Sequence, residues 1–171
     1  MAKITGFRKI IIHLGIILLF IVLAYAYLFP LIEGKIIQQP DIEHHKGMAK
    51  ELIEYREETG EEAIWTNRMF GGMPGYLIST LYEGNLLSDL HFVFRKAFHP
   101  AAILILYMLG FFILLTSLGI KRWLSVAGAV AFGFSSYFII IIGAGHNTKA
   151  YAIDYLMSVI ARVLFAFKNK P

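Results

Sequence analysis

Long apolar runs alternate with charged segments along the chain. Three runs contain no charged residue: Ile10–Phe29, Ala101–Ile120 and Leu124–Ile142. A fourth run, Tyr151–Phe167, is shorter and includes Asp154 and Arg162. An α-helix rises about 1.5 Å per residue, so runs of this length suit a bilayer core about 30 Å thick. The pattern predicts an all-α integral membrane protein with about four transmembrane helices.

The charged residues beside these runs predict their orientation. Basic residues gather before the first run, between the second and third, and after the fourth: Lys3, Arg8, Lys9, Lys121, Arg122, Lys168 and Lys170. Short cytoplasmic segments carry an excess of Lys and Arg, so both chain ends are predicted to be cytoplasmic. Residues 30–100 hold more acidic than basic side chains and are predicted to form an outer loop.

Composition narrows the class of protein further. Only 16% of the residues are charged, against about 25% in soluble domains, and the mean hydropathy is +0.63. The chain has no cysteine, which excludes disulfides, cysteine-ligated metals and thiol nucleophiles. The net charge of +4 arises from the cytoplasmic segments, so no nucleic-acid partner is expected. The length favours a single membrane domain over residues 1–171.

The N-terminal run has two interpretations. A basic start, an apolar run and Ala24-Tyr25-Ala26 have the three parts of a secretory signal peptide. The run continues past Ala26 to Phe29, however, which favours a retained membrane anchor.

The outer loop is too long to be a simple connector and should have structure of its own. A helix is predicted from Asp41 to Thr59-Gly60, where glycine can adopt the left-handed closing conformation. Its apolar face is expected to lie on the outer membrane surface and comprises Ile42, His45, Met48, Ala49, Leu52 and Ile53.

The segment WTNRMFGGMPGYLIST follows this helix and is rich in glycine and aromatic residues. Such a composition indicates either a tight loop that approaches a ligand or a turn whose aromatics sit at the lipid headgroups. Further along, Leu86–Phe98 is predicted to be an amphipathic segment that leads into the second span.

Individual residues inside the spans carry more specific expectations. Ser125, Ala129 and Gly133 recur every four residues, a stripe that allows close helix packing. His13 is expected to be a hydrogen-bonded interfacial group or a proton relay. Asp154 should face protein or water, with Lys149 or Arg162 as its partner.

Candidate chemistry is confined to the outer side, because the chain has no P-loop, GxSxG, HExxH or dinucleotide motif. Asp41 and Glu43 follow the first span, and a carboxylate there could deprotonate a hydroxyl while a cation holds a phosphate. The cation and amide donors would come from the loop GAGHNTK, which contains His146, Asn147 and Lys149.

Each carboxylate also has a purely structural interpretation. Asp41 is placed to cap the helix that follows, and Glu43 to lie on its solvated surface. The adjacent His44 and His45 would point about 100° apart on a helix and make a poor metal pair. No cofactor is predicted, because two carboxylates are too few ligands to specify a divalent metal.

Two stretches carry a family resemblance: IIQQPDIEHHKGMAKELIEYREETGEEAIWTNRMFGGMPGYLIST and SSYFIIIIGAGHNTKAYAIDY. Over residues 1–156 the chain resembles the N-terminal region of the YfhO-like bacterial membrane proteins. These are longer polytopic proteins related to the C-class glycosyltransferases. From Met157 the sequence departs from that pattern, and we expect the chain to be an N-terminal fragment, inactive alone.

The resemblance implies a bacterial inner-membrane enzyme that moves a sugar from a polyprenyl-phosphate carrier to an envelope acceptor on the outer face. It places the catalytic role on Asp41, with Glu43 as its neighbour. It also implies substrate-binding roles in the glycine-rich segment and in the loop GAGHNTK: Trp65, Asn67, Arg68, Phe70, Gly72, His146, Asn147 and Lys149. The alternative function is a non-enzymatic transport or assembly subunit in which Asp154 lines a polar path.

Overall fold

The computed structural model describes residues 6–79, 92, 96 and 100–168. The chain forms two compact units: residues 1–38 with 93–171, and residues 39–92. We call these the bundle and the outer-loop unit. The predicted amphipathic segment Leu86–Phe98 lies outside the described residues, apart from residues 92 and 96.

The bundle consists of helices, as the apolar runs predict. Its elements are α1 (Gly6–Tyr27), the short 3-10 helix η1 (Phe29–Leu31), α4 (Ala101–Ser117), α5 (Arg122–Gly133), α6 (Ser136–Ala144) and α7 (Asn147–Lys168). Two of these helices, α1 and α7, are long and apolar enough to cross a membrane. The first span was expected at Ile10–Phe29, whereas α1 begins at Gly6 and ends at Tyr27. It ends there because the chain turns into η1 around Pro30.

The third expected span is bent. Residues 124–142 form two helices, α5 and α6, whose axes differ by 44°, and together they count as a third candidate span. The Phe134 amide still makes a helical bond to the Val130 carbonyl, but the Ser135 amide bonds to the Phe132 carbonyl instead. The Ser135 carbonyl then accepts the first bonds of α6. Small and hydroxyl residues at such a point weaken the ladder and permit the bend.

α4 is shorter than its apolar run and has 17 residues. Its last turn holds Thr116 and Ser117, whose hydroxyls donate back to carbonyls of the preceding turn. Gly119 then takes a left-handed φ of 87°, and the helix closes. The run Ala101–Ile120 thus contains a helix and its closing turn.

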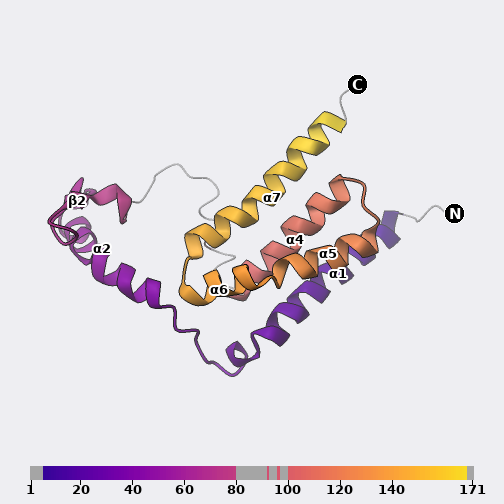
Figure 1. Ribbon diagram of the computed structural model, residues 1–171, viewed down its shortest axis with the longest axis horizontal. Coiled ribbons are helices and arrows are strands. Elements are labelled where there is room, and N and C mark those ends of the chain that lie inside the picture. Colours follow the sequence, from indigo (N-terminus) through magenta and orange to yellow (C-terminus); the bar gives the residue numbers. More distant parts are fainter. Residues whose placement is uncertain (1–5, 80–91, 93–95, 97–99, 169–171) are drawn as a thin grey trace. The chain divides into compact units, whose positions relative to one another are not determined.

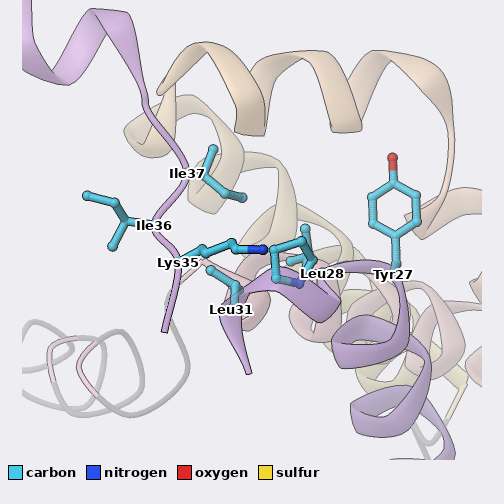
Figure 2. Close-up of a pocket in the computed structure, with 7 residues that line it drawn as sticks. Tyr27, Leu28, Leu31, Lys35, Ile36 and Ile37 are labelled. Atoms are coloured by element: carbon cyan, nitrogen blue, oxygen red, sulfur yellow. The ribbon is translucent and has the colours of Figure 1, made fainter. Parts of the chain in front are cut away.

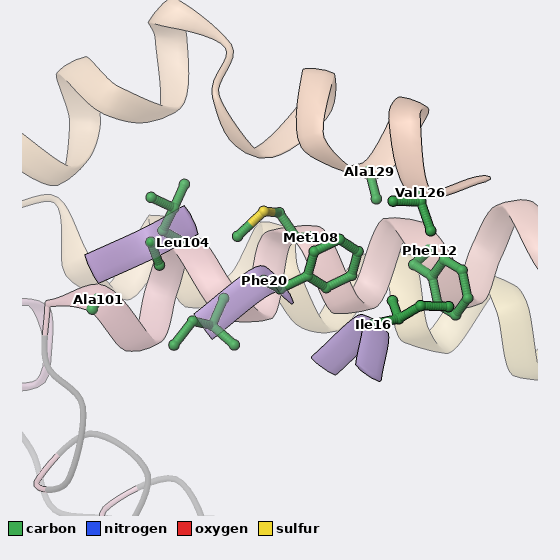
Figure 3. Packing of buried hydrophobic residues seen from close by; sticks show 10 residues of the cluster. Ile16, Phe20, Ala101, Leu104, Met108, Phe112, Val126 and Ala129 are labelled. Atoms are coloured by element: carbon green, nitrogen blue, oxygen red, sulfur yellow. The ribbon is translucent and has the colours of Figure 1, made fainter. Parts of the chain in front are cut away.

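α4 is the central helix of the bundle and contacts α1, α5 and α7 (Figure 1). On one side, Phe20 of α1 and Phe112 of α4 meet edge to face, with ring centroids 6.1 Å apart. Phe20 and Met108 are completely buried in this cluster (Figure 3). Around it, α1 keeps many large apolar side chains exposed, as a lipid-facing helix does: Phe7, Ile10, Ile11, Leu14, Leu18 and Val22.

The predicted stripe of small residues is confirmed as a packing surface. Ser125, Ala129 and Gly133 are all buried. A Cβ added at Gly133 would lie 2.7 Å from Met108 Cγ, so α4 and α5 approach too closely there for a larger side chain. His13 also matches its structural interpretation: its Nδ1 lies 2.7 Å from the Lys9 carbonyl oxygen, a hydrogen-bonding distance.

Asp154 is buried, with 3% of its surface exposed, as a charge-bearing residue in a span should be. It lies on α7 where that helix passes close to Gly110 of α4. Within the described residues, its Oδ2 has no hydrogen-bond partner. Neither expected partner is found there: Arg162 is exposed, and the Lys149 ammonium lies over the Tyr137 ring.

The outer-loop unit contains α2 (Pro40–Thr59), the strands β1 (Trp65–Thr66) and β2 (Met73–Pro74), and the 3-10 helix η2 (Gly75–Leu77). The predicted helix is confirmed, and it ends at Gly60 with φ 75° and a bond from the Gly60 amide to the Arg56 carbonyl. Its buried face is narrower than predicted: Ala49 and Leu52 are buried, whereas His45 and Ile53 are exposed.

Candidate functional site

Asp41 lies in the first turn of α2, directly after the proline that begins the helix. Pro40 is favoured at this first position because it has no amide hydrogen to leave unpaired. The cap position therefore falls on Gln39, and the interpretation of Asp41 as the N-cap is wrong. Asp41 is half-buried and lies in the first turn of α2, where the helix dipole favours a negative charge.

Glu43 has the surface position that its structural interpretation predicts. Its carboxylate accepts from the Lys46 ammonium at 2.7 Å, and 69% of its side chain is exposed. An exposed pair of this kind contributes only about 0 to 1 kcal/mol to stability. Glu43 and Lys46 therefore form a surface pair on α2.

The glycine-rich segment forms a tight hairpin, residues 63–79, which we call the hairpin. Trp65 and Thr66 pair antiparallel with Pro74 and Met73. Three successive residues at the tip have positive φ: Phe70 at 49°, Gly71 at 80° and Gly72 at 122°. A Cβ at Gly72 would lie 2.6 Å from the Trp65 indole nitrogen, so glycine is required there for the indole to pack across the turn.

Glu51 fastens this hairpin to α2. Its Oε2 accepts from the Thr66 hydroxyl at 2.6 Å and from the Asn67 amide at 3.2 Å. The bond from Thr66, followed by the one from Asn67, holds the pKa of the Glu51 carboxyl below its usual range. Sequence reasoning missed Glu51, because a contact between residues so far apart in the chain leaves no periodic signal.

The predicted substrate-binding residues of the hairpin are mostly on its surface. Phe70 is 93% exposed and Trp65 is 55% exposed, and Asn67 and Arg68 are exposed as well. Asp41 precedes Glu51 by nearly three turns of helix, a rise of about 15 Å. The outer-loop unit thus places the hairpin residues together and Asp41 apart from them.

The turn between α6 and α7 holds the other predicted residues. Gly145 has φ 98°, and the amides of Gly145 and His146 both bond to the Ile141 carbonyl, which closes α6. The His146 carbonyl accepts from Ala150, and α7 begins at Asn147. Lys149 lies with its Nζ 5.2 Å from the Tyr137 ring centroid, an attractive cation–π contact.

Two apolar cavities lie beside the end of α1. The first, about 220 Å³, is lined by Tyr27, Leu28, Pro30, Leu31, Lys35, Ile36 and Ile37 (Figure 2). The second, about 210 Å³, shares Tyr27, Leu28 and Ile37 and extends to Leu104, Ile139, Ile142 and Gly143. The first cavity is formed by the continuous segment 27–37, whereas the second depends on how α1, α4 and α6 pack and so could not be predicted from a local pattern.

Lys35 is the charged residue of the first cavity. Its ammonium pairs with Glu33, but both side chains are largely exposed. Such a pair is weak and can exchange for another anion at little cost. Among the described residues, no three His, Asp or Glu side chains gather closely enough to hold a metal ion.

The apolar helices and their exposed lipid-facing side chains define a helical membrane protein. Two helices can span the membrane, or three if the bent pair α5 and α6 forms one span. Comparisons with protein-family models, curated proteins and solved structures find no match to this chain.

Proposed function

We propose that this chain is the N-terminal part of a membrane glycosyltransferase that takes its sugar from a polyprenyl-phosphate carrier on the outer face of the bacterial inner membrane. Four spans, a cytoplasmic N-terminus and a likeness to the C-class glycosyltransferase fold belong to this proposal. The acceptor is a hydroxyl of an envelope glycan or polymer.

The observation that carries the proposal is the order of features after the first span. α1 ends beside two apolar cavities, Lys35 stands at the first of them, and Asp41 follows shortly after it in the chain. The chain from Lys35 to Asp41 reaches at most about 20 Å. An apolar cavity, a cation and a carboxylate in this order suit a lipid tail, its phosphate and the reacting hydroxyl.

The chemistry is an inverting displacement. Asp41 takes the proton of the acceptor hydroxyl, and the resulting oxygen attacks the anomeric carbon of the sugar. The bond from that carbon to the carrier phosphate breaks, and the phosphate leaves with the electron pair. Lys35 or Lys149 meets the negative charge that develops on the phosphate, whereas Arg68, the other cation expected from the sequence, lies on the hairpin apart from Asp41.

The transport alternative stays a prediction. A polar path across the bundle would require Asp154 to line a cavity. Asp154 is 3% exposed and lines neither of the two cavities beside α1.

The test is Asp41→Asn in the protein as its cell makes it, assayed in membranes with radiolabelled polyprenyl-phosphate-linked hexoses. Asparagine cannot accept the proton, so transfer should fall by about 100-fold or more while expression and insertion stay normal. Glu43→Gln is the matched control on the same turn of α2 and should transfer at close to the normal rate. Near-normal transfer by Asp41→Asn would refute the catalytic role.

A further inference from the structure

We infer that the hairpin docks into the headgroup layer of the lipid bilayer. The inference concerns a membrane contact and holds whether or not Asp41 is catalytic. The proposed partner of the exposed side of the hairpin is a phospholipid surface. It decides between the two interpretations that the sequence left open for the aromatic residues of this segment.

The hairpin exposes more apolar surface than a water-facing turn would. Several of its large apolar side chains are more than half exposed: Phe70 at 93%, Ile64 at 83%, Leu77 at 62%, Tyr76 at 60% and Trp65 at 55%. Adjacent large apolar side chains left exposed mark an interaction surface. Trp and Tyr are the residues that favour the lipid headgroup region, where a ring can be apolar on one side and hydrated on the other.

The anchoring to α2 leaves these side chains free to face outward. Thr66 points to α2, because its hydroxyl donates to Glu51. Side chains alternate along a strand, so Trp65 points to the opposite face. At the tip, three positive-φ residues fix the turn and leave Phe70 standing out.

The hairpin differs in charge from the rest of the outer-loop unit, and this difference indicates a phosphate-bearing partner. Acidic side chains outnumber basic ones over residues 40–62, whereas residues 63–79 carry a single charge, the exposed Arg68. A membrane with anionic phosphates repels the helix surface and attracts the hairpin. The apolar face and the lone cation of the hairpin therefore favour the same end of the unit for contact with lipid.

The covalent structure tethers the outer-loop unit to an apolar helix that can span a membrane. The outer-loop unit lies in the chain between two apolar helices, and only the short segment 28–39 separates the end of α1 from the start of α2. A segment of this length reaches at most about 40 Å, which limits how far the start of α2 can lie from the end of α1.

The chain contains two tryptophans, Trp65 in the hairpin and Trp123 at the start of α5, and this permits a matched experiment. Trp123→Phe leaves Trp65 as the sole reporter, and Trp65→Phe leaves Trp123. Each protein is reconstituted in vesicles of phosphatidylethanolamine and phosphatidylglycerol, with or without phospholipids brominated near the carbonyl end of their chains. Bromine quenches only a tryptophan at that depth.

Trp65 should emit at short wavelength and be quenched by the brominated lipid to an extent similar to Trp123. Adding Phe70→Ser and Tyr76→Ser to the Trp123→Phe protein should reduce that quenching by about twofold or more, because two anchors are lost. Both side chains are exposed, so the far-ultraviolet circular dichroism should be unchanged. Water-like, unquenched Trp65 emission beside quenched Trp123 would overturn the inference, and so would quenching that the serine variants leave intact.

Discussion

Gly72 shows how one residue can determine the shape of the hairpin. Its φ of 122° belongs to a region that other residues rarely adopt, and the Trp65 indole occupies the space of a Cβ. Its neighbour Gly71, with φ 80°, has nothing within 4 Å of a built Cβ. A substitution at Gly71 therefore changes the backbone preference alone, whereas a substitution at Gly72 also brings a side chain against the Trp65 indole.

Gly72→Ala should destabilise the hairpin by about 1 to 3 kcal/mol, because it combines backbone strain with a clash. Gly71→Ala should cost only about 1 kcal/mol and leave Trp65 in place. The near-ultraviolet circular dichroism of Trp65, recorded in the Trp123→Phe background, measures both effects. An unchanged Trp65 signal in Gly72→Ala would show that the indole does not pack across the turn.

Lys35 makes a residue-scale prediction about the donor phosphate. If the first cavity receives the lipid carrier, Lys35→Gln should raise the KM for polyprenyl-phosphate sugar more than it lowers kcat. Lys46→Gln is the control, because Lys46 pairs with Glu43 on the surface of α2. Equal kinetics for the two variants would remove Lys35 from the donor site.

At the scale of elements, a single carboxylate joins α2 to the hairpin. Glu51 accepts two hydrogen bonds from the hairpin, and its pKa is lowered as a result. A group whose folded pKa is lowered adds stability above its unfolded pKa, and that stability is lost as the pH falls through the folded value. The hairpin should therefore detach below the ordinary glutamate value of 4.5.

Amide hydrogen exchange of residues 64–75 should report this detachment. Exchange should accelerate as the pH falls below about 4, after correction for intrinsic rates. Glu51→Gln should show fast exchange at every pH, whereas Glu54→Gln, on an exposed part of the same helix, should behave like the parent. A pH-independent hairpin in the parent protein would contradict the role of Glu51.

The contact between α4 and α5 provides a second element-scale prediction. Gly133→Val would push a side chain into Met108 and should destabilise the bundle by about 1 to 3 kcal/mol. Gly15→Val on α1 has open space around its Cβ and serves as the control. Thermal unfolding in detergent compares the two, and equal stabilities would contradict the close packing of the small-residue stripe.

For the whole molecule, apolar run lengths and turn residues predicted the helical class, α2 with its closing Gly60, the small-residue stripe and the burial of Asp154. They could not predict the bend at Gly133–Ser135, because an uncharged run looks the same whether its helix is straight or broken. The same patterns offered Asp41 as the N-cap of α2. The helix begins at Pro40, one residue earlier, and its N-cap is Gln39.

The candidate site was harder to predict, because it depends on contacts between distant residues. The family resemblance implied roles for Phe70, Trp65 and Arg68, and these residues lie together on the hairpin. The contact through which Glu51 holds that hairpin and the second cavity beside α1 depend on tertiary contacts that leave no local pattern. Run length, local turn chemistry and charge are visible in a sequence, and these contacts are not.

The central claim is that the outer-loop unit, which carries Asp41, lies on the outer side of the membrane. The link between α4 and α5 is proposed to lie on the cytoplasmic side. The chain has no cysteine, so single cysteines at Glu58 and Lys121, both exposed, can each be labelled uniquely. A membrane-impermeant maleimide applied to intact spheroplasts should label Glu58→Cys at once and Lys121→Cys only after the membrane is opened. Labelling of both cysteines from the same side would contradict the account.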